Sequence, residues 1–213
     1  TRRLNIKSVS KRQFLAELIV EKAENLVRSN MGERFMGFAP FIAAILGLSA
    51  LSSLSSLLGL YPPTSDINIV AGWAILVFIL ITHYKLKGGL GNYLKGYTEP
   101  IAVFTPINII SEVATPVSMT FRHFGNVLSG SVISVLVAAA LQGLTSLLLG
   151  WLPGLLGDIP FLQIGIPAVL SLYFDIFSGC LQAFIFSMLT MLYIANGFPE
   201  EAYEKRRLKK HRA

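Results

Sequence analysis

The residue with the clearest chemical consequence is Arg122, because it is the one basic side chain that stands between long apolar stretches. The other Lys and Arg residues form three groups: eight in 1–34, three in 85–95 and six in 205–212. A guanidinium in the hydrocarbon region of a bilayer costs from about 3 to more than about 10 kcal/mol, and arginine cannot lose its proton to escape that cost. A fixed positive charge at that depth can bind an anion or repel a cation. We therefore expect function to lie around Arg122.

Further polar side chains are predicted to meet Arg122 if the apolar stretches 100–150 and 161–195 form antiparallel helices. With a turn near residue 152, residues whose numbers add up to about 304 become neighbours, because both helices have the same rise per residue. Helical periodicity then places polar residues on one stripe of each helix. These residues are Thr115, Arg122, Asn126 and Ser129 on the first helix, and Asp175, Ser178 and Gln182 on the second.

Facing polar stripes inside a bilayer form either an ion path or interhelical hydrogen bonds. For Asn126 and Ser178 alone, both interpretations remain open. Arg122 and Asp175 are offset by about two turns, or roughly 10 Å, so we expect no direct salt bridge. Glu112 lies ten residues before Arg122. The order acid, arginine, acid is what two ion access routes separated by a fixed positive barrier would have.

The composition indicates a polytopic all-α membrane protein with a single membrane domain. Of 213 residues 53% are hydrophobic and 14% are charged, with a mean hydropathy of +0.61, whereas a soluble domain has about 25% charged residues. The basic clusters are typical of cytoplasmic segments. They do not form the basic surface with interspersed aromatic residues that binds nucleic acid, so a nucleic-acid partner is not expected. The one cysteine, Cys180, and the absence of Cys-His spacing predict neither a disulfide nor a metal or other cofactor.

Four segments complete the predicted architecture around the two long stretches. Residues 10–34 alternate apolar and charged positions at helical spacing, which predicts an amphipathic helix on the cytoplasmic interface. Residues 35–60 and 67–84 are each long enough to span a membrane, with YPPTSD as the turn between them. Residues 198–213 form a basic cytoplasmic tail.

The two long stretches allow two interpretations, because a perpendicular membrane helix needs only about twenty residues. Each stretch is either one strongly tilted helix or two shorter spans, with FRHFGN as a loop in the first stretch. Charge counting favours two long tilted helices in a hairpin, with bends possible at Pro106 and Pro116. Cutting both stretches gives the same sidedness to the basic tail, so this alternative stays open.

Several motifs resemble the a subunit of the F-type ATP synthase membrane sector, over essentially the whole chain. They are RHFGN with the preceding PVS, LQAFIFSMLTMLYI, PTSDINI, GGLGNYLKG and PINIISE. The resemblance implies two long tilted helices that clasp a rotating ring of c subunits, with an essential arginine facing the ring carboxylates and two offset half-channels. It also implies peripheral-stalk b subunits as partners, a bacterial plasma membrane with both basic ends cytoplasmic, and no bond chemistry by this chain itself.

The resemblance assigns roles to individual residues. Carried over by motif, the essential arginine is Arg122. The other matching positions are Asn126 and Gln182 as its polar neighbours, Glu112 and Ser118 in the cytoplasmic half-channel, and Asp66 and Asn68 near the outer one.

Three positions depart from the usual pattern of that family. Ser131 stands where many relatives have Glu, nine residues after the arginine, and Asp175 stands where many have His, seven residues before the glutamine. Because positions 131 and 175 can share one site in the hairpin, we expect the acid of the outer route to lie on the facing helix. His123 stands where leucine is common, and we favour an interhelical hydrogen bond over a proton relay for it. The family also usually has an additional membrane helix before the basic N-terminal segment, so we expect a shortened form or an incomplete sequence.

The sequence therefore predicts the stationary ion-translocating subunit of a rotary ATP synthase. Two alternatives remain: a secondary transporter whose Arg122 binds an anionic substrate, and a structural membrane protein with interhelical polar contacts. A choice between H⁺ and Na⁺ is not predicted, because the ion-binding carboxylate belongs to another chain.

Overall fold

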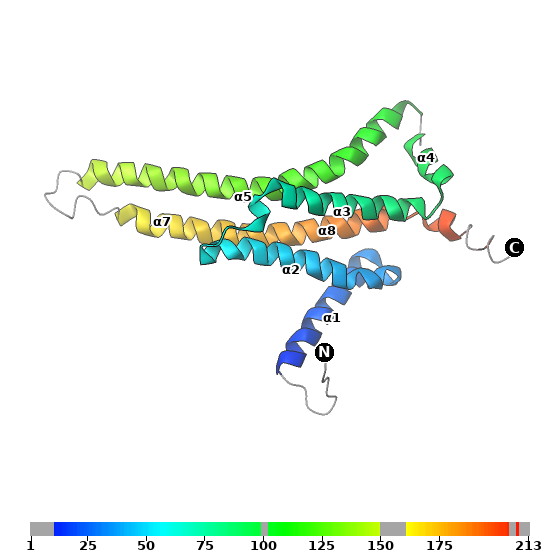
Figure 1. Cartoon of the computed structure of the whole chain (residues 1–213), viewed down its shortest axis with the longest axis horizontal. Coiled ribbons are helices and arrows are strands. Elements are labelled where there is room, and N and C mark those ends of the chain that lie inside the picture. Colours follow the sequence, from blue (N-terminus) through cyan, green and yellow to red (C-terminus); the bar gives the residue numbers. More distant parts are fainter. Residues whose placement is uncertain (1–10, 99–101, 150–160, 205–207, 209–213) are drawn as a thin grey trace. The chain divides into compact units, whose positions relative to one another are not determined.

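The described part of the chain consists of helices and the turns that join them (Figure 1). The computed structural model describes residues 11–98, 102–149, 161–204 and 208. The predicted turn at 150–160 and most of the basic tail lie outside these residues. The α-helices are α1 (Lys11–Met31), α2 (Ala39–Ser55), α3 (Ile67–Leu86), α4 (Leu90–Thr98), α5 (Thr105–Leu149), α7 (Phe161–Ser171) and α8 (Gly179–Gly197).

Four helical segments of the described residues are long and apolar enough to cross a membrane. They are residues 33–58, 67–86, 105–148 and 165–197. The predicted class, an all-α polytopic membrane protein, is confirmed. The amphipathic helix expected over 10–34 corresponds to α1, which leaves Phe14, Leu15 and Ile19 exposed. Its position on a membrane surface stays a prediction.

α5 is one uninterrupted helix of 45 residues. The alternative with FRHFGN as a loop is therefore wrong, because residues 121–126 lie inside this helix. Pro106 is the second residue of α5, where a missing N–H costs no helical hydrogen bond, so no bend is needed there. Pro116 lies inside the helix, and the Thr120 hydroxyl donates a hydrogen bond to its carbonyl at 2.8 Å.

The helical segment that follows residue 160 contains an irregular turn. Between α7 and α8 lies a π-helical turn, η5 (Leu172–Ser178), in which backbone hydrogen bonds join residues five apart. π-Helical turns are rare and are frequently found at functional sites. Asp175, the acid predicted for the outer route, lies in the middle of this turn.

The chain packs as two units. The first unit comprises Thr1–Gly47, Ile75–Thr115 and Ile185–Ala213, and the second comprises Leu48–Ala74 and Pro116–Phe184. Each unit therefore combines segments that are far apart in the sequence.

The first unit joins the start of the first membrane segment to the end of the last one. Arg34 forms ion pairs with Glu200 at 3.2 Å and Glu204 at 3.4 Å, and its guanidinium lies 5.2 Å from the centroid of the Phe198 ring. Gly32, with φ of 84°, ends α1 in a conformation that other residues rarely adopt. The turn lets the chain continue into the short 3₁₀ helix Glu33–Phe38.

The second unit is held by close helix contacts at two glycines. A Cβ atom at Gly130 would lie 3.1 Å from the Cβ of Phe174, so α5 and η5 touch there. A Cβ atom at Gly179 would lie 2.6 Å from the Cβ of Ser53, which brings the end of α2 against the start of α8. Figure 1 shows the second half of α5 running beside α7. Glycines at such contacts let helices approach closely inside a membrane.

Candidate functional site

Arg122 lies on an exposed face of α5 in the second unit. Within the described residues its side chain has no hydrogen bond or ion pair. The next residue, His123, is fully buried, and its Nε2 lies 3.2 Å from the Ser49 hydroxyl on α2. The His123 ring also packs edge-on against Trp73 of α3, with centroids 6.2 Å apart. These contacts fix the rotation of α5 and hold Arg122 on the outward side; they include the interhelical hydrogen bond expected for His123.

Asn126 and Ser178 form the interhelical contact that the hairpin register predicts. The Ser178 hydroxyl donates a hydrogen bond to Oδ1 of Asn126 at 2.6 Å. Gln182, four residues further along, is buried, and within the described part of the chain it makes no side-chain hydrogen bond. Among the described residues no hydrogen bond joins Gln182 to Arg122, so their pairing stays a prediction.

A cavity of about 470 Å³ in the second unit, here the Asp175 pocket, contains the two positions predicted to share one site. Ser131 and Asp175 both line it. Asp175 accepts a hydrogen bond from the Ser171 hydroxyl at 2.5 Å. The remaining polar lining consists of hydroxyl and amide side chains, namely Ser53, Ser56, Tyr61, Ser65, Asn126 and Ser134. No Lys, Arg or His side chain is among the described residues that line this pocket.

Asp66 and Asn68 follow closely after Ser65, a lining residue of the Asp175 pocket, but they do not line the pocket themselves. Oδ1 of Asp66 accepts hydrogen bonds from the backbone N–H of Asn68 at 2.8 Å and from its side-chain amide at 3.0 Å. This arrangement satisfies an N–H group at the start of α3, as a capping carboxylate does. Ser65, the preceding residue, does line the pocket. A role for Asp66 or Asn68 in ion transfer stays a prediction.

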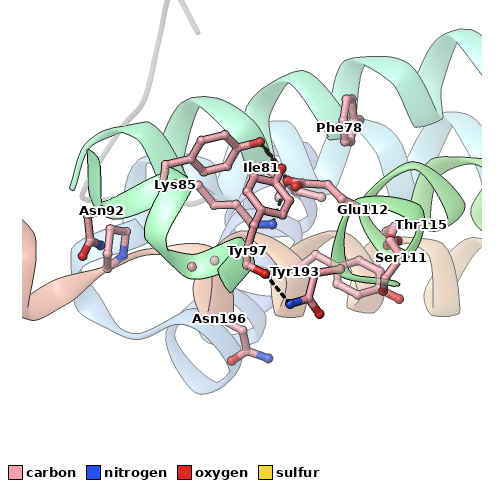
Figure 2. Close-up of a pocket in the computed structure, with 15 residues that line it drawn as sticks. Phe78, Ile81, Lys85, Asn92, Tyr97, Ser111, Glu112, Thr115, Tyr193 and Asn196 are labelled. Atoms are coloured by element: carbon pink, nitrogen blue, oxygen red, sulfur yellow. Dashed lines mark hydrogen bonds and ion pairs between the residues drawn. The ribbon is translucent and has the colours of Figure 1, made fainter. Parts of the chain in front are cut away.

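A second cavity of about 470 Å³, here the Glu112 pocket, lies in the first unit (Figure 2). Lys85 of α3 donates a hydrogen bond from Nζ to Oε1 of Glu112 on α5 at 2.8 Å. The Tyr93 hydroxyl of α4 donates to the same oxygen at 3.3 Å, and it lies 2.6 Å from the Tyr97 hydroxyl. The Glu112 side chain is only 9% exposed. Burial, followed by the negative charge of Glu112 and the hydrogen bond to it, raises the pKa of Tyr93.

Lys85 and Tyr93 were not among the residues predicted for the site. The sequence places Lys85 in a basic cluster, and such clusters are typical of lipid-facing cytoplasmic segments. One signal was present: Tyr93 and Tyr97 stand four residues apart, which puts both hydroxyls on one face of a short helix. Ser118 is exposed and lines neither cavity, so its predicted place in the cytoplasmic route is untested.

The contact between Asn126 and Ser178 gives a direct test of the register. In a Cys180→Ser background, Asn126→Cys with Ser178→Cys should crosslink rapidly with a short bifunctional thiol reagent in native membranes. The control pair is Leu136→Cys with Ser178→Cys, in which the first cysteine lies ten residues, or about 15 Å, further along α5. Crosslinking is measured as a mobility shift on non-reducing gels. Equal rates for the two pairs would contradict the observed register.

The comparisons with known proteins agree on one family. The family described as ATP synthase A chain matches residues 1–195. ATP synthase subunit a of Desulforamulus reducens is 33% identical over 95% of this chain and 73% of its own length. ATP synthase subunit a 1 of Crocosphaera subtropica is 32% identical over 92% and 77%, and the subunit a of Acidothermus cellulolyticus is 34% identical over 87% and 65%. The chain belongs to the ATP synthase A chain family, and it is a multi-pass subunit of the ATP synthase membrane sector.

Proposed function

We propose that this chain is the stationary ion-translocating subunit of a rotary F-type ATP synthase. The observation that carries the proposal is Arg122: a permanent cation on a membrane helix, exposed, and held outward by the buried His123. An exposed guanidinium without a partner in the described chain is suited to a carboxylate on another subunit. The partner that fits is a ring of c subunits, with b subunits as a peripheral stalk.

The Asp175 pocket is proposed as the outer access route to the ring. Ions enter past Asp66 and the pocket's hydroxyl groups, and reach a ring carboxylate near Asn126. Binding of the ion neutralises that carboxylate, so it can move through lipid at much lower cost than a charge. The long α5, about 68 Å at 1.5 Å per residue, would have to tilt to stay within a bilayer of about 30 Å.

The Glu112 pocket is proposed as the cytoplasmic exit route. After almost a full turn, the ring carboxylate meets Arg122, whose positive charge favours the ionised form because it lowers a neighbouring carboxyl pKa. The released ion leaves past Ser118 and Glu112. Arg122 also repels cations and so prevents direct leakage between the two routes. In this scheme the chain makes and breaks no covalent bond, and both basic ends face the cytoplasm of a bacterium.

Purification of the complex tests the proposal. The chain is tagged, extracted from native membranes in a mild detergent, and the co-purifying proteins are identified by mass spectrometry. We expect a ring of small helical-hairpin subunits, each with one membrane-embedded carboxylate, together with the catalytic sector. Reconstituted into vesicles, the complex should move ions when ATP is added. Isolation of the chain without any such ring, or ATP-driven pumping by a complex that lacks the chain, would contradict the proposal.

A further inference from the structure

We propose that Lys85 is a specificity-determining residue, whose ammonium group occupies the cation position of the Glu112 pocket and closes it to Na⁺ while protons still pass. The inference rests on the proposed function, because it concerns the ion that uses the cytoplasmic route. It adds a choice between the two coupling ions, which the motifs of the sequence leave open.

The described lining of the Glu112 pocket contains one positive and one negative side chain, which form an ion pair with each other. Among its described lining residues, Lys85 and Glu112 are the charged ones, and their Nζ and Oε1 atoms lie 2.8 Å apart. The Lys85 side chain is 33% exposed and the Glu112 side chain 9%. Oε1 of Glu112 also accepts the Tyr93 hydroxyl. Two donors therefore converge on Oε1 of Glu112, and a metal cation bound to this carboxylate would stand next to the Lys85 ammonium group.

Lys85 is held in place by the helix behind it. A Cβ atom at Gly197, the last residue of α8, would lie 3.3 Å from Cγ of Lys85. The aliphatic part of the Lys85 side chain therefore packs against α8 at Gly197, which has no side chain to block it. Beyond this contact the ammonium group reaches Glu112, and Figure 2 shows the two side chains together in the pocket. Because its side chain is packed in this way, Lys85 keeps its positive charge at one position beside Glu112, whereas the charge of an unpacked surface lysine moves with its side chain.

Na⁺ and protons differ in what they need from such a pocket. A hard metal cation needs several oxygen ligands around it, and here it would also stand beside an ammonium group. A proton needs only a chain of groups that donate on one side and accept on the other. Tyr97, Tyr93 and Glu112 form such a chain, with oxygen separations of 2.6 and 3.3 Å. A tyrosine hydroxyl is protonated at neutral pH, and the Tyr93 hydroxyl donates its hydrogen bond to Glu112.

The Asp175 pocket has a different lining, which makes the inference specific to one route. Its carboxylate is surrounded by hydroxyl and amide groups, and no basic side chain is among its described lining residues. Exclusion of metal cations by a fixed charge is therefore expected from the Glu112 pocket alone.

The test compares two lysines of the same segment. Lys85→Met removes the ammonium group from the pocket. Lys87→Met is the control, because Lys87 lies over the Tyr84 ring at 3.9 Å and lines a separate cavity beside Arg34. Whole complexes with each change are reconstituted, and ATP-driven acidification is recorded as choline is replaced by Na⁺ at constant ionic strength.

We expect Na⁺ to leave the wild-type and Lys87→Met rates unchanged and to slow Lys85→Met at least threefold. Lys85→Arg should remain insensitive to Na⁺, and Lys85→Met with Glu112→Gln should lose the sensitivity, because the uncompensated carboxylate is gone. A Lys85→Met complex that pumps normally at every Na⁺ concentration would overturn the inference, as would equal sensitivity in Lys87→Met.

Two further outcomes would also overturn it. The first is ATP-driven uptake of ²²Na⁺ by the wild-type complex. The second is failure of both Lys85→Met and Lys85→Gln to assemble, which would assign Lys85 a structural role. Neither result bears on the proposed function itself, which depends on the co-purifying ring and on Arg122.

Discussion

Arg122→Ala is expected to abolish ATP-driven ion pumping while the subunit stays in the membrane and in the complex. A neighbouring positive charge lowers a carboxyl pKa by about 1 to 3 units, so its loss weakens release of the ion by about 10- to 1,000-fold. The folding cost should be small, because within the described residues the guanidinium has no hydrogen bond or ion pair. Lys should replace Arg122 poorly, because an ammonium group can lose its proton and lacks the planar fork of a guanidinium.

The measurement is ATP-dependent acidification, or Na⁺ uptake, of vesicles that contain equal amounts of complex. Arg28→Ala is the matched control, because Arg28 is an exposed arginine of α1 whose ion pair with Glu33 is long, at 3.9 Å. That variant should pump at the wild-type rate, since exposed ion pairs contribute little to stability. Pumping near the wild-type rate in Arg122→Ala would show that the proposed mechanism is wrong.

Asp175→Asn should slow transport about 100-fold without preventing assembly. Loss of one proton-transfer group typically costs about 10²–10⁴-fold, and we expect the low end of this range because the serine-lined pocket remains. The reason is that Asp175 is the acid of the Asp175 pocket, and the amide keeps its size and can still accept from the Ser171 hydroxyl. Because Ser131 lines the same cavity, Ser131→Glu should return a carboxylate to it and recover part of the rate. Transport is followed in vesicles across pH 6 to 9.

Ser171→Ala serves as the comparison for this variant, since it removes the hydrogen bond to the carboxylate and keeps the carboxylate itself. It should have a smaller effect than Asp175→Asn. A normal transport rate in Asp175→Asn over the whole pH range would make Asp175 a structural residue. A full rate in Asp175→Asn with Ser131→Glu would instead support exchange of one acid between the two helices.

Part of the arrangement could be predicted because helix geometry leaves little freedom. Once a turn near residue 152 is assumed, the common rise of two helices determines which residues meet, and the hydrogen bond between Asn126 and Ser178 confirms the pairing. The all-α membrane class could be predicted because apolar segments of this length are typical of membrane-spanning helices. The shared cavity of Ser131 and Asp175 followed from that register as well.

Other features could not be predicted, because they depend on contacts between distant segments. The ion pair of Lys85 and Glu112 needs α3, α4 and α5 to pack around one cavity, and the order of residues in the sequence contains no sign of it. The contact of His123 with Ser49 and Trp73 likewise joins three helices. The π-helical turn was missed because a constant rotation of 100° per residue was assumed across 161–195.

The π-helical turn η5 affects how relatives of this chain should be compared. A π turn contains one more residue than an α turn, so side chains on the two sides of Leu172–Ser178 differ in direction by about one residue, or 100°, from a straight helix. An alignment that matches residues by position alone therefore compares side chains that point in different directions wherever one relative has the wide turn and another does not. Gain or loss of a single residue in this turn can change which group faces the cavity while leaving the flanking helices intact.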